Sequence, residues 1–346
     1  MKAVKLYEII IKPKSGFGTP LKGDTIFGHI CWQASYNPEL LNGGLEKWIA
    51  GYGERPFAVF SSAWPKIRKG SAMYYAVKRP DFPPNRLFPP SVKDRRKALE
   101  QKKEILKKKW LLVSENLGIS LAAGNFITDE ELLTLSFQEL TGQTRKAMRK
   151  KADRQLKAPF IQPHNTINRA TMTTGRGMFA PFAETADFYY PETELAIFVL
   201  IDEDATDIDR MTTALCRIGT VGFGRNASTG CGRFSLAKST EKAWSPKAEA
   251  DACYTLAPAI PEKGLYKDGW FTPFTRFGRH GDALAVSKNP FKNPVIMTDE
   301  GAVFIPADRN VFSKPYLGCA AFNVSKVLSG AVTQGYSFYL PFKLEN

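Results

Sequence analysis

The segment TVGFGRNASTGCGRF (residues 220–234) combines closely spaced glycines with Arg225 and Arg233. Five glycines lie between Gly219 and Gly232. Because glycine has no Cβ atom, such a segment lets the backbone approach another group closely. Backbone amides and guanidinium groups together bind phosphate oxygens. The segment could therefore hold a nucleotide, hold a longer nucleic-acid strand, or pack against another turn of the same chain.

The spacing and the chain direction of this segment disfavour a nucleotide phosphate loop. In G-x-x-x-x-G-K-[ST], a lysine follows the second glycine, but Cys231 stands there; the pattern G-x-G-x-x-G fails at Ala227. Both motifs lead from a strand into the N-terminus of a helix. Here a predicted helix (204–219) comes first and a predicted strand (232–239) follows. A nucleotide hydrolase is not favoured, whereas composition does not decide between binding a sugar–phosphate backbone and a simple turn.

His29 is a candidate for acid–base chemistry, because it lies on a predicted helix just after the basic glycine turn KSGFGTPLKGD (14–24). An imidazole there could reach a bound RNA strand. A single helical histidine is more often structural, and the chain contains no GxSxG or HExxH motif. His164, in PHNTINR (163–169), is similarly ambiguous. The three histidines and five cysteines have no metal-ligand spacing, so we expect no metal and no cofactor.

The charge of the chain points to a polyanionic partner. Of its 346 residues, 48 are Lys or Arg and 34 are Asp or Glu, for a formal net charge of +14. A field of that sign favours nucleic acid. No stretch approaches the roughly 20 apolar residues of a membrane span, so no membrane partner is expected. An odd number of cysteines without a CxxC pair suits a reducing compartment, and the predicted location is cytoplasmic.

Periodicity and turn residues indicate the elements that position these side chains. Asp24 is the expected N-cap of the first helix. Residues 93–109 predict a basic helix with a narrow apolar stripe, and 143–157 an arm or loop. Residues 158–190 predict a hairpin with a polar, exposed tip at Gly-Arg-Gly. The remaining expected elements are strands at 3–12, 57–65, 194–202 and 232–239, helices from 24 and at 204–219, and a boundary at 239–250 followed by a smaller α+β domain.

Three of these segments, in this order, carry a resemblance to a known family. They are GTPLKGDTIFGHICW (18–32), HNTINRATMTTGRGMF (164–179) and TALCRIGTVGFGRNASTGCGRF (213–234). Together they resemble the RAMP superfamily of CRISPR-associated RNA-binding proteins, in the form of the fourth subunits of type III-A Csm complexes. The likeness covers about 1–240 and is looser in the C-terminal third, where VIMTDEGAVF (295–304) carries it.

The resemblance implies an α+β fold of two ferredoxin-like (RRM-like) domains in tandem. The first would span 1–240, with a basic insertion at about 80–157, a hairpin thumb within about 160–190 and the glycine-rich loop 219–233. The second, smaller domain would span 241–346. The insertion has no role implied by the family. The order strand–helix at the start and helix–loop–strand at 204–239 suits a β-α-β-β-α-β unit independently.

The family also implies a function. It is that of a non-catalytic structural subunit that holds the 5′ repeat-derived handle of the guide RNA. The subunit would connect the large cyclase/polymerase-like Csm subunit to the backbone RAMP subunit in antiviral defence. The alternative is a metal-independent RAMP endoribonuclease that processes repeat RNA with His29 as general acid/base. The predicted RNA-binding residues are Lys14, Lys22, His29, His164, Asn165, Asn168, Arg169, Gly222, Phe223, Gly224, Arg225, Ser228, Thr229, Gly230, Gly232 and Arg233.

Overall fold

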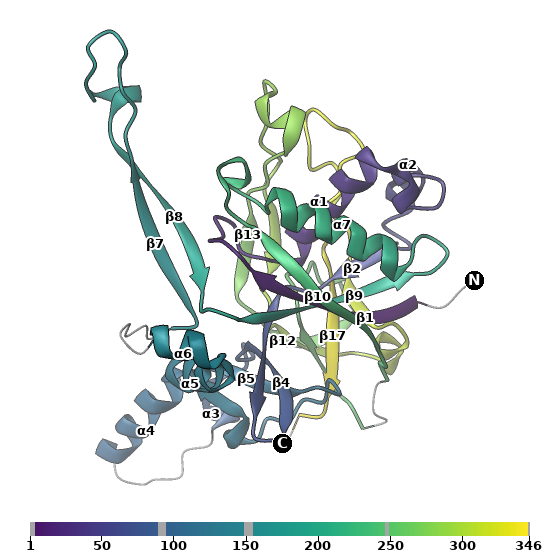
Figure 1. Ribbon diagram of the computed structural model, residues 1–346. Helices are drawn as coiled ribbons and strands as arrows, with labels where there is room; N and C mark the ends of the chain where they lie inside the picture. Colours follow the sequence, from purple (N-terminus) through teal and green to yellow (C-terminus); the bar gives the residue numbers. More distant parts are fainter. Residues whose placement is uncertain (1–3, 89–94, 149–154, 246–248, 345–346) are drawn as a thin grey trace.

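The strand β1 (Val4–Pro13) lies inside an antiparallel sheet between β9 (Glu194–Asp202) and β10 (Phe234–Lys242) (Figure 1). The structure is a computed structural model that describes residues 4–88, 95–148, 155–245 and 249–344. Residues 6–11 of β1 are all buried, so both faces of the strand are covered. Its nearly continuous apolar run is typical of a strand in that position.

The N-terminal part of the sheet has the strand order of a ferredoxin-like unit. The expected second strand is divided into β2 (Ala58–Phe60) and β3 (Trp64–Lys69), and both pair with β9. The order β10-β1-β9-β3 is therefore the fourth, first, third and second strand of a β-α-β-β-α-β unit. Its two helices, α1 (Gly23–Tyr36) and α7 (Ile208–Val221), lie side by side over the sheet (Figure 1).

The insertion at about 80–157 is partly built into the same sheet. Beyond β3, the sheet continues with β4 (Ala72–Lys78), which precedes the insertion, and then with β5 (Lys108–Ser114) and β6 (Phe126–Thr128), which belong to it. The predicted basic helix is present as α4 (Arg95–Lys107). The helices α3 (Pro84–Leu87), α5 (Asp129–Glu139) and α6 (Gly142–Met148), and the turn η2 (Ala123–Asn125), complete the insertion.

The loop predicted for 143–157 is wrong for its first half, which forms α6. The helix is held at its start by the carboxylate of Glu192, which accepts hydrogen bonds from the Thr141 amide (2.8 Å) and the Thr144 hydroxyl (2.6 Å). A negative charge at a helix N-terminus is stabilising, and this partner lies 48 residues away from Thr144 in the chain. Residues 149–154 of the predicted arm lie outside the described part of the chain.

The predicted hairpin is present as β7 (Lys157–His164) and β8 (Phe182–Tyr189), which project from the body of the molecule (Figure 1). Its tip is exposed as predicted, but it is not purely polar. Ile167, Met172 and Met178 are 56%, 75% and 81% exposed, respectively. The tip also contains the short turn η3 (Gly177–Phe179).

The C-terminal part forms a second antiparallel sheet with the order β12-β15-β11-β17-β16. The run β17-β11-β15-β12 matches the fourth, first, third and second strands of a ferredoxin-like unit, but no α-helix occurs among the described residues after 250. A complete second ferredoxin-like domain is therefore not confirmed. The strands are β11 (Ala252–Thr255), β12 (Tyr266–Trp270), β13 (Pro273–Arg276), β14 (Val295–Thr298), β15 (Val303–Pro306), β16 (Tyr316–Gly318) and β17 (Tyr336–Phe342). The short helices and turns elsewhere are η1 (Pro38–Leu40), α2 (Leu45–Ala50), η4 (Ala227–Thr229), η5 (Asp282–Val286) and η6 (Arg309–Ser313).

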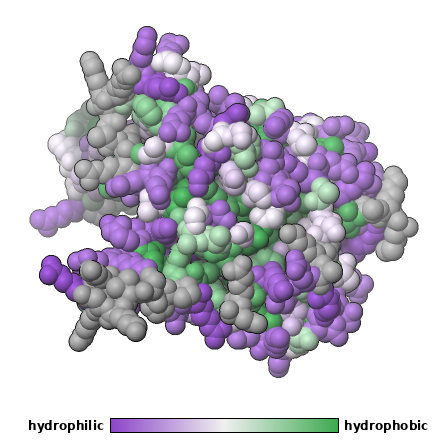
Figure 2. Space-filling view, turned by 90° about the horizontal axis from the view of Figure 1, so that it is seen from below, coloured by the Kyte–Doolittle hydropathy of each residue, from purple (hydrophilic) through white to green (hydrophobic). Residues whose placement is uncertain are grey.

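The two sheets share one hydrophobic core. Side chains of β1 and β9 belong to the same buried cluster as Tyr254, Phe338 and Leu340 of the C-terminal sheet. The division into domains 1–240 and 241–346 consequently stays a prediction. Hydrophobic side chains also gather at the centre of the lower face, among hydrophilic ones (Figure 2).

Asp24 is not the N-cap that the sequence suggested, because α1 begins one residue earlier and Lys22 occupies the cap position. The buried carboxylate of Asp24 instead pairs with Arg276 of β13, with Oδ1 and Nη2 2.8 Å apart. Lys22 forms ion pairs with Asp299 and with Glu300, the latter at 2.6 Å. These ion pairs attach the start of α1 to the C-terminal part, and sequence alone could not reveal contacts over such separations.

A buried carboxylate, that of Glu8 in β1, connects side chains from four strands of the sheet. Only 1% of its surface is exposed. It accepts hydrogen bonds from Lys66 Nζ (2.7 Å) and Tyr75 Oη (2.9 Å), and Lys242 Nζ lies 3.3 Å away. The strands β1, β3, β4 and β10 are thereby connected through one side chain.

Replacing Glu8 with Ala should leave the Lys66 ammonium buried with an incomplete set of partners. We expect the free energy of unfolding to fall by about 3–5 kcal/mol, the cost of removing one member of a buried ion pair. Urea denaturation of the full-length protein measures it. Glu241→Ala is the control, because that side chain is 57% exposed and should change stability by less than about 0.5 kcal/mol. Equal midpoints for the two variants would contradict the prediction.

Candidate nucleic-acid interface

The turn at 14–19 and the loop at 222–233 form one backbone unit. The amide of Lys14 donates to the Arg233 carbonyl (2.8 Å), and the amide of Gly232 donates to the Gly16 carbonyl (2.7 Å). The amide of Arg225 donates to Thr19 Oγ1 at 2.9 Å. Two basic segments more than 200 residues apart in the chain are thus held side by side.

Most glycines of the loop are needed because the backbone there packs closely against the loop itself or against Thr19. A Cβ atom on Gly232 would lie 2.1 Å from the Phe223 carbonyl oxygen, and one on Gly224 would lie 2.4 Å from the Thr19 Cβ. One on Gly222 would meet the Cys231 carbonyl at 2.5 Å. All three have positive φ angles, which glycine adopts without strain. Gly230, with φ of +96°, is the exception in this loop, since a Cβ there would enter open space.

His29 supports the loop from α1. Its Nε2 accepts a hydrogen bond from the Gly224 amide at 3.1 Å, and its ring packs on that of Phe223 with centroids 4.5 Å apart. An accepting Nε2 requires an unprotonated nitrogen at that position. Burial lowers the pKa of His29 to about 4. The imidazole is therefore neutral at pH 7 and is already engaged in a structural hydrogen bond.

The outer side of this unit presents the basic and polar side chains that the sequence predicted. Lys14, Arg225 and Arg233 are exposed, as are Ser228 and Thr229. Arg225 is oriented by the hairpin, because its Nη2 donates to the Thr185 carbonyl at 2.7 Å. In contrast, Phe223, Gly222 and Gly232 are buried and maintain the shape of the loop.

The hairpin is attached to the loop through β8. Asn226 Nδ2 donates to Glu184 Oε2 at 2.5 Å, and His164 Nε2 lies 3.7 Å from the same oxygen. His164 also stacks on Phe182, with ring centroids 5.2 Å apart. His164 is thus connected to the glycine loop, whereas Asn165, Asn168 and Arg169 lie beyond the strand pairing, in the tip.

Lys22 is separated from the exposed basic residues. Only 14% of its side chain is exposed, and its ammonium contacts Asp299, Glu300 and the ring of Phe274. Burial raises the pKa of Glu300 to about 7, while the hydrogen bond with Glu300 and the ammonium of Lys22 hold the pKa of Asp299 low, against its burial. A side chain held in this way is a poor candidate for direct RNA contact, and its predicted role stays untested.

Sequence reasoning missed the residues that orient the interface. Thr19 accepts a hydrogen bond that joins the 14–19 turn to the glycine loop, and the hydrogen bond from Asn226 to Glu184 joins that loop to the hairpin. Polar residues of these types occur in any loop, so nothing in their local sequence indicates such a role. Nor does the sequence indicate that Gly224 and Thr19, 205 residues apart, contact each other.

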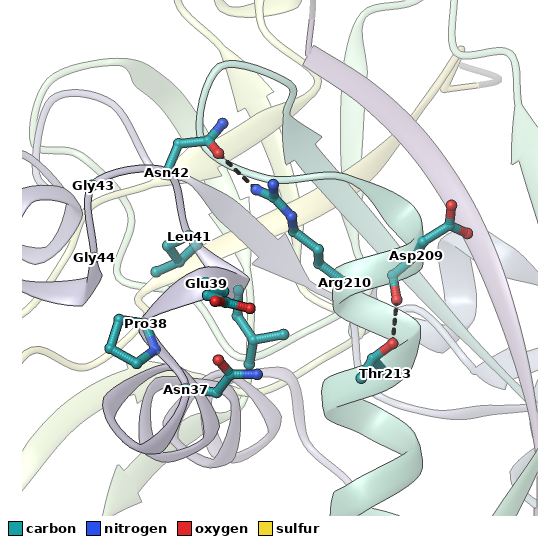
Figure 3. Close-up of a pocket in the computed structure, with 11 residues that line it drawn as sticks. Asn37, Pro38, Glu39, Leu41, Asn42, Gly43, Gly44, Asp209, Arg210 and Thr213 are labelled. Carbon is teal, nitrogen blue, oxygen red and sulfur yellow. Dashed lines mark hydrogen bonds between the residues drawn. The ribbon is translucent and has the colours of Figure 1, made fainter.

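The candidate interface is an exposed surface rather than a pocket. A pocket of about 770 Å³ lies at the opposite end of α7, where Arg210 donates to Asn42 Oδ1 at 2.7 Å (Figure 3). It contains no predicted site residue.

In the described part of the chain, no three His, Cys, Asp or Glu side chains are grouped as metal ligands. Nor does any helix described there have the length and apolar character to cross a bilayer.

The chain therefore combines a ferredoxin-like unit, a glycine-rich loop after its second helix and a projecting hairpin, and this fold is the one that the resemblance to the RAMP superfamily implied. Two solved structures share it over nearly the whole chain. A chain of the Csm3-Csm4 subcomplex of the type III-A CRISPR-Cas interference complex is 14% identical, with a TM-score of 0.53, covering 98% of this chain and 99% of that one. A chain of the Csm1-Csm4 cassette in complex with cA4 is 16% identical, with a TM-score of 0.52 and the same coverage.

Csm4 is the component that these two assemblies have in common. The resemblance inferred from the sequence is therefore confirmed at the level of the fold, which is Csm4-like. No protein-family model matches the chain, and no curated protein does.

Gly232 and Gly230 provide a test of the packing role of the loop glycines. Both have positive φ angles (+73° and +96°), but only Gly232 lacks room for a Cβ atom. We expect Gly230→Ala to cost about 1–2 kcal/mol of stability, from backbone strain alone. Gly232→Ala should cost clearly more, because the Phe223 backbone must also move. Urea denaturation compares them, and an equal cost would refute the close approach.

The pKa of His29 predicts a stability that falls in mild acid. The unfolded chain protonates His29 near pH 6.5, while the folded chain does so only near 4. Between these values the unfolded state binds more protons, so stability decreases as pH falls. We expect His29 to account for a loss on the order of 1–2 kcal/mol between pH 7 and pH 5.

His29→Gln should reduce this pH dependence, because its amide oxygen can accept the Gly224 hydrogen bond without titrating. Part of the dependence should remain, since burial also lowers the pKa of His280. Gln162→Ala, which removes an exposed side chain without an ionisable group, is the control and should keep the wild-type profile. Urea midpoints at several pH values measure all three proteins. An unchanged profile in His29→Gln would show that His29 is not the titrating group.

Proposed function

We propose that this protein is a Csm4-like, non-catalytic subunit of a type III-A CRISPR effector complex in the cytoplasm. In this role it holds the 5′ repeat-derived handle of the guide RNA. The observation that carries the proposal is the surface formed by Lys14, Arg225 and Arg233, which are exposed on two segments fixed by backbone hydrogen bonds. Because the backbone of both segments is already fixed, binding phosphates through the side chains it carries costs less conformational entropy than ordering a free loop would.

The chemistry of this surface suits a single RNA strand. Arginines and lysines neutralise phosphates, while Ser228, Thr229 and the accessible backbone at Gly230 offer further hydrogen-bonding groups. The projecting hairpin adds exposed apolar side chains against which splayed bases can pack. A formal charge of +14 would also accelerate association with RNA.

The proposed partners are the large cyclase/polymerase-like subunit and a backbone RAMP subunit. Support comes from the fold, since chains of this fold occur in structures of a Csm1-Csm4 cassette and of a Csm3-Csm4 subcomplex. Placement between two such subunits would put the handle at one end of the assembly. The predicted hairpin thumb would then reach along the guide RNA.

The alternative, an endoribonuclease using His29, is weakened by the surroundings of that residue. A general acid should be protonated near the working pH, whereas the pKa of His29 is about 4. Its Nε2 is also occupied by the Gly224 amide. Incubation of the protein with repeat RNA in EDTA tests the alternative. A discrete cut that is lost in His29→Ala would favour it over the proposal.

The proposed RNA surface predicts the effect of removing its charges. The triple variant Lys14→Ala, Arg225→Ala, Arg233→Ala should lower the amount of guide RNA that co-purifies with the assembled complex by about tenfold or more. Three lost phosphate contacts should also reduce the salt dependence of RNA binding, by a slope of about 2. Filter binding across a range of salt concentrations measures the slope.

The matched control removes the same charge elsewhere. Lys263, Lys267 and Lys314 are exposed on the C-terminal part, and their triple replacement by Ala should leave RNA retention near the wild-type level. If both triple variants lost RNA equally, binding would depend on net charge alone. If neither lost it, the handle site would lie elsewhere.

A further inference from the structure

The strands β13 and β14 form a two-stranded ribbon outside the main C-terminal sheet. Their pairing places Thr275 opposite Ile296. Past residues 276 and 295 the pairing becomes irregular, but the ribbon continues. The backbone amide of Lys292 donates to the Gly278 carbonyl (2.8 Å), and Arg279 lies opposite Phe291. The ribbon therefore runs from 273 to 280 on one strand and from 290 to 298 on the other.

The inner face of the ribbon is fixed to the start of α1. Arg276 pairs with the buried Asp24, and the ring of Phe274 lies beneath Lys22 Nζ at 4.5 Å from the ring centroid. His280 is buried and hydrogen-bonds Ser325 Oγ at 2.7 Å. Because α1 directly follows the turn at 14–19, the ribbon is rigidly connected to the proposed RNA surface.

The outer face of the ribbon carries large apolar side chains in solvent. Phe277, Phe291 and Ile296 are 74%, 67% and 76% exposed. Ile296 lies opposite Thr275, and Phe291 lies opposite Arg279. Residues 275, 277 and 279 are exposed while 274, 276, 278 and 280 are half-buried or buried, and this alternation places Phe277 on the same outer side as these residues. Exposed apolar groups gathered on one face of a soluble protein usually mark a binding surface.

The charge on this face distinguishes among binding partners. Among the described side chains of 271–298, the exposed charged ones are Arg279, on this face, and Lys288, in the segment that connects the two strands, and both are basic. The guanidinium of Arg279 lies over the ring of Phe291, 5.7 Å from its centroid, and donates to the Ala285 carbonyl at 3.0 Å. Aromatic rings held beside fixed cations are what base stacking and phosphate contact require.

We propose that the outer face of the β13–β14 ribbon is a second RNA-binding surface, on which Phe277 and Phe291 stack bases of a single strand. Arg279 and Lys288 would contact the adjacent phosphates. The inference rests on the proposed function, since it assumes that the chain binds RNA. It extends that function from the handle surface at 14–19 and 222–233 to a base-stacking site on the C-terminal part.

A protein partner on the same patch would require a different chemistry. An apolar protein contact is satisfied by any side chain of similar size, whereas base stacking requires an aromatic ring. Leucine and tyrosine substitutions at Phe277 and Phe291 therefore separate the two. Leucine keeps the apolar surface and removes the π-system, while tyrosine keeps the ring.

The experiment measures binding of fluorescein-labelled single-stranded RNA to the full-length protein by anisotropy. One probe is a 12-nucleotide oligoadenylate, and the other has the same backbone with abasic sites. The variants are Phe277→Leu/Phe291→Leu and Phe277→Tyr/Phe291→Tyr. Ile296→Ala is the control, because it removes apolar surface from the same face without removing a ring. Circular dichroism verifies that each variant is folded.

Wild-type protein should bind oligoadenylate at least about fivefold more tightly than the abasic probe, the effect of one stacked base. The double leucine variant should reduce this difference by about fivefold or more, and the double tyrosine and Ile296→Ala variants should keep it. Equal behaviour of the leucine and tyrosine variants would overturn the stacking site and favour a protein contact, while the proposed function would stand. Failure of wild-type protein to bind either probe would overturn both proposals.

Discussion

The turn at 14–19 and the loop at 222–233 approach each other as bare backbone, and the organisation of the N-terminal part depends on that contact. Glycines permit it, since a Cβ atom on Gly224 would lie 2.4 Å from Thr19 Cβ, and one on Gly18 would lie 2.8 Å from the Arg225 carbonyl oxygen. Gly222 and Gly232 let the loop fold closely on itself, because a Cβ there would meet the backbone of Cys231 or Phe223. The side chains of Lys14, Arg225 and Arg233 lie on the outer, exposed side of this contact. Glycines that seemed suited to approach a ligand thus approach the protein itself, and the arginines between them face solvent.

The consequences of this contact extend along α1. His29, on one side of the helix, accepts a hydrogen bond from the Gly224 amide. The start of the helix is attached to β13 by the ion pair between Asp24 and Arg276. The loop, the helix and the C-terminal ribbon are therefore one mechanical unit. The hairpin joins it through Asn226 and Glu184. Two surfaces with RNA-compatible chemistry, one basic and one aromatic, are held by the same helix.

The sequence predicted the parts of the fold that depend on local pattern. The apolar run at 3–12, the helix expected at 204–219 and the hairpin expected at 158–190 all have periodicities or turns of their own. It failed where distant partners decide the outcome. Helix α6 depends on Glu192, and the helices expected of a second ferredoxin-like unit are absent from the described C-terminal residues.

The sequence indicated which segments form the candidate site, but it did not indicate how their side chains are arranged. Gly-rich composition and two arginines located the loop, but only the fold reveals that Phe223 is buried and that Lys22 is neutralised by Asp299 and Glu300. The exposed rings of Phe277 and Phe291 had no sequence signal. Alternating aromatic residues in a strand are equally common in a core.

The central claim is that RNA lies along the outward side of the unit formed by 14–19 and 222–233. Ultraviolet crosslinking of the purified complex with its co-purified RNA, followed by mass spectrometry of the peptides, tests it most directly. The structure predicts crosslinks in peptides containing Lys14, Arg225 or Arg233, on a small RNA with a defined 5′ end. Crosslinks confined to the basic insertion, with none in these peptides, would contradict it.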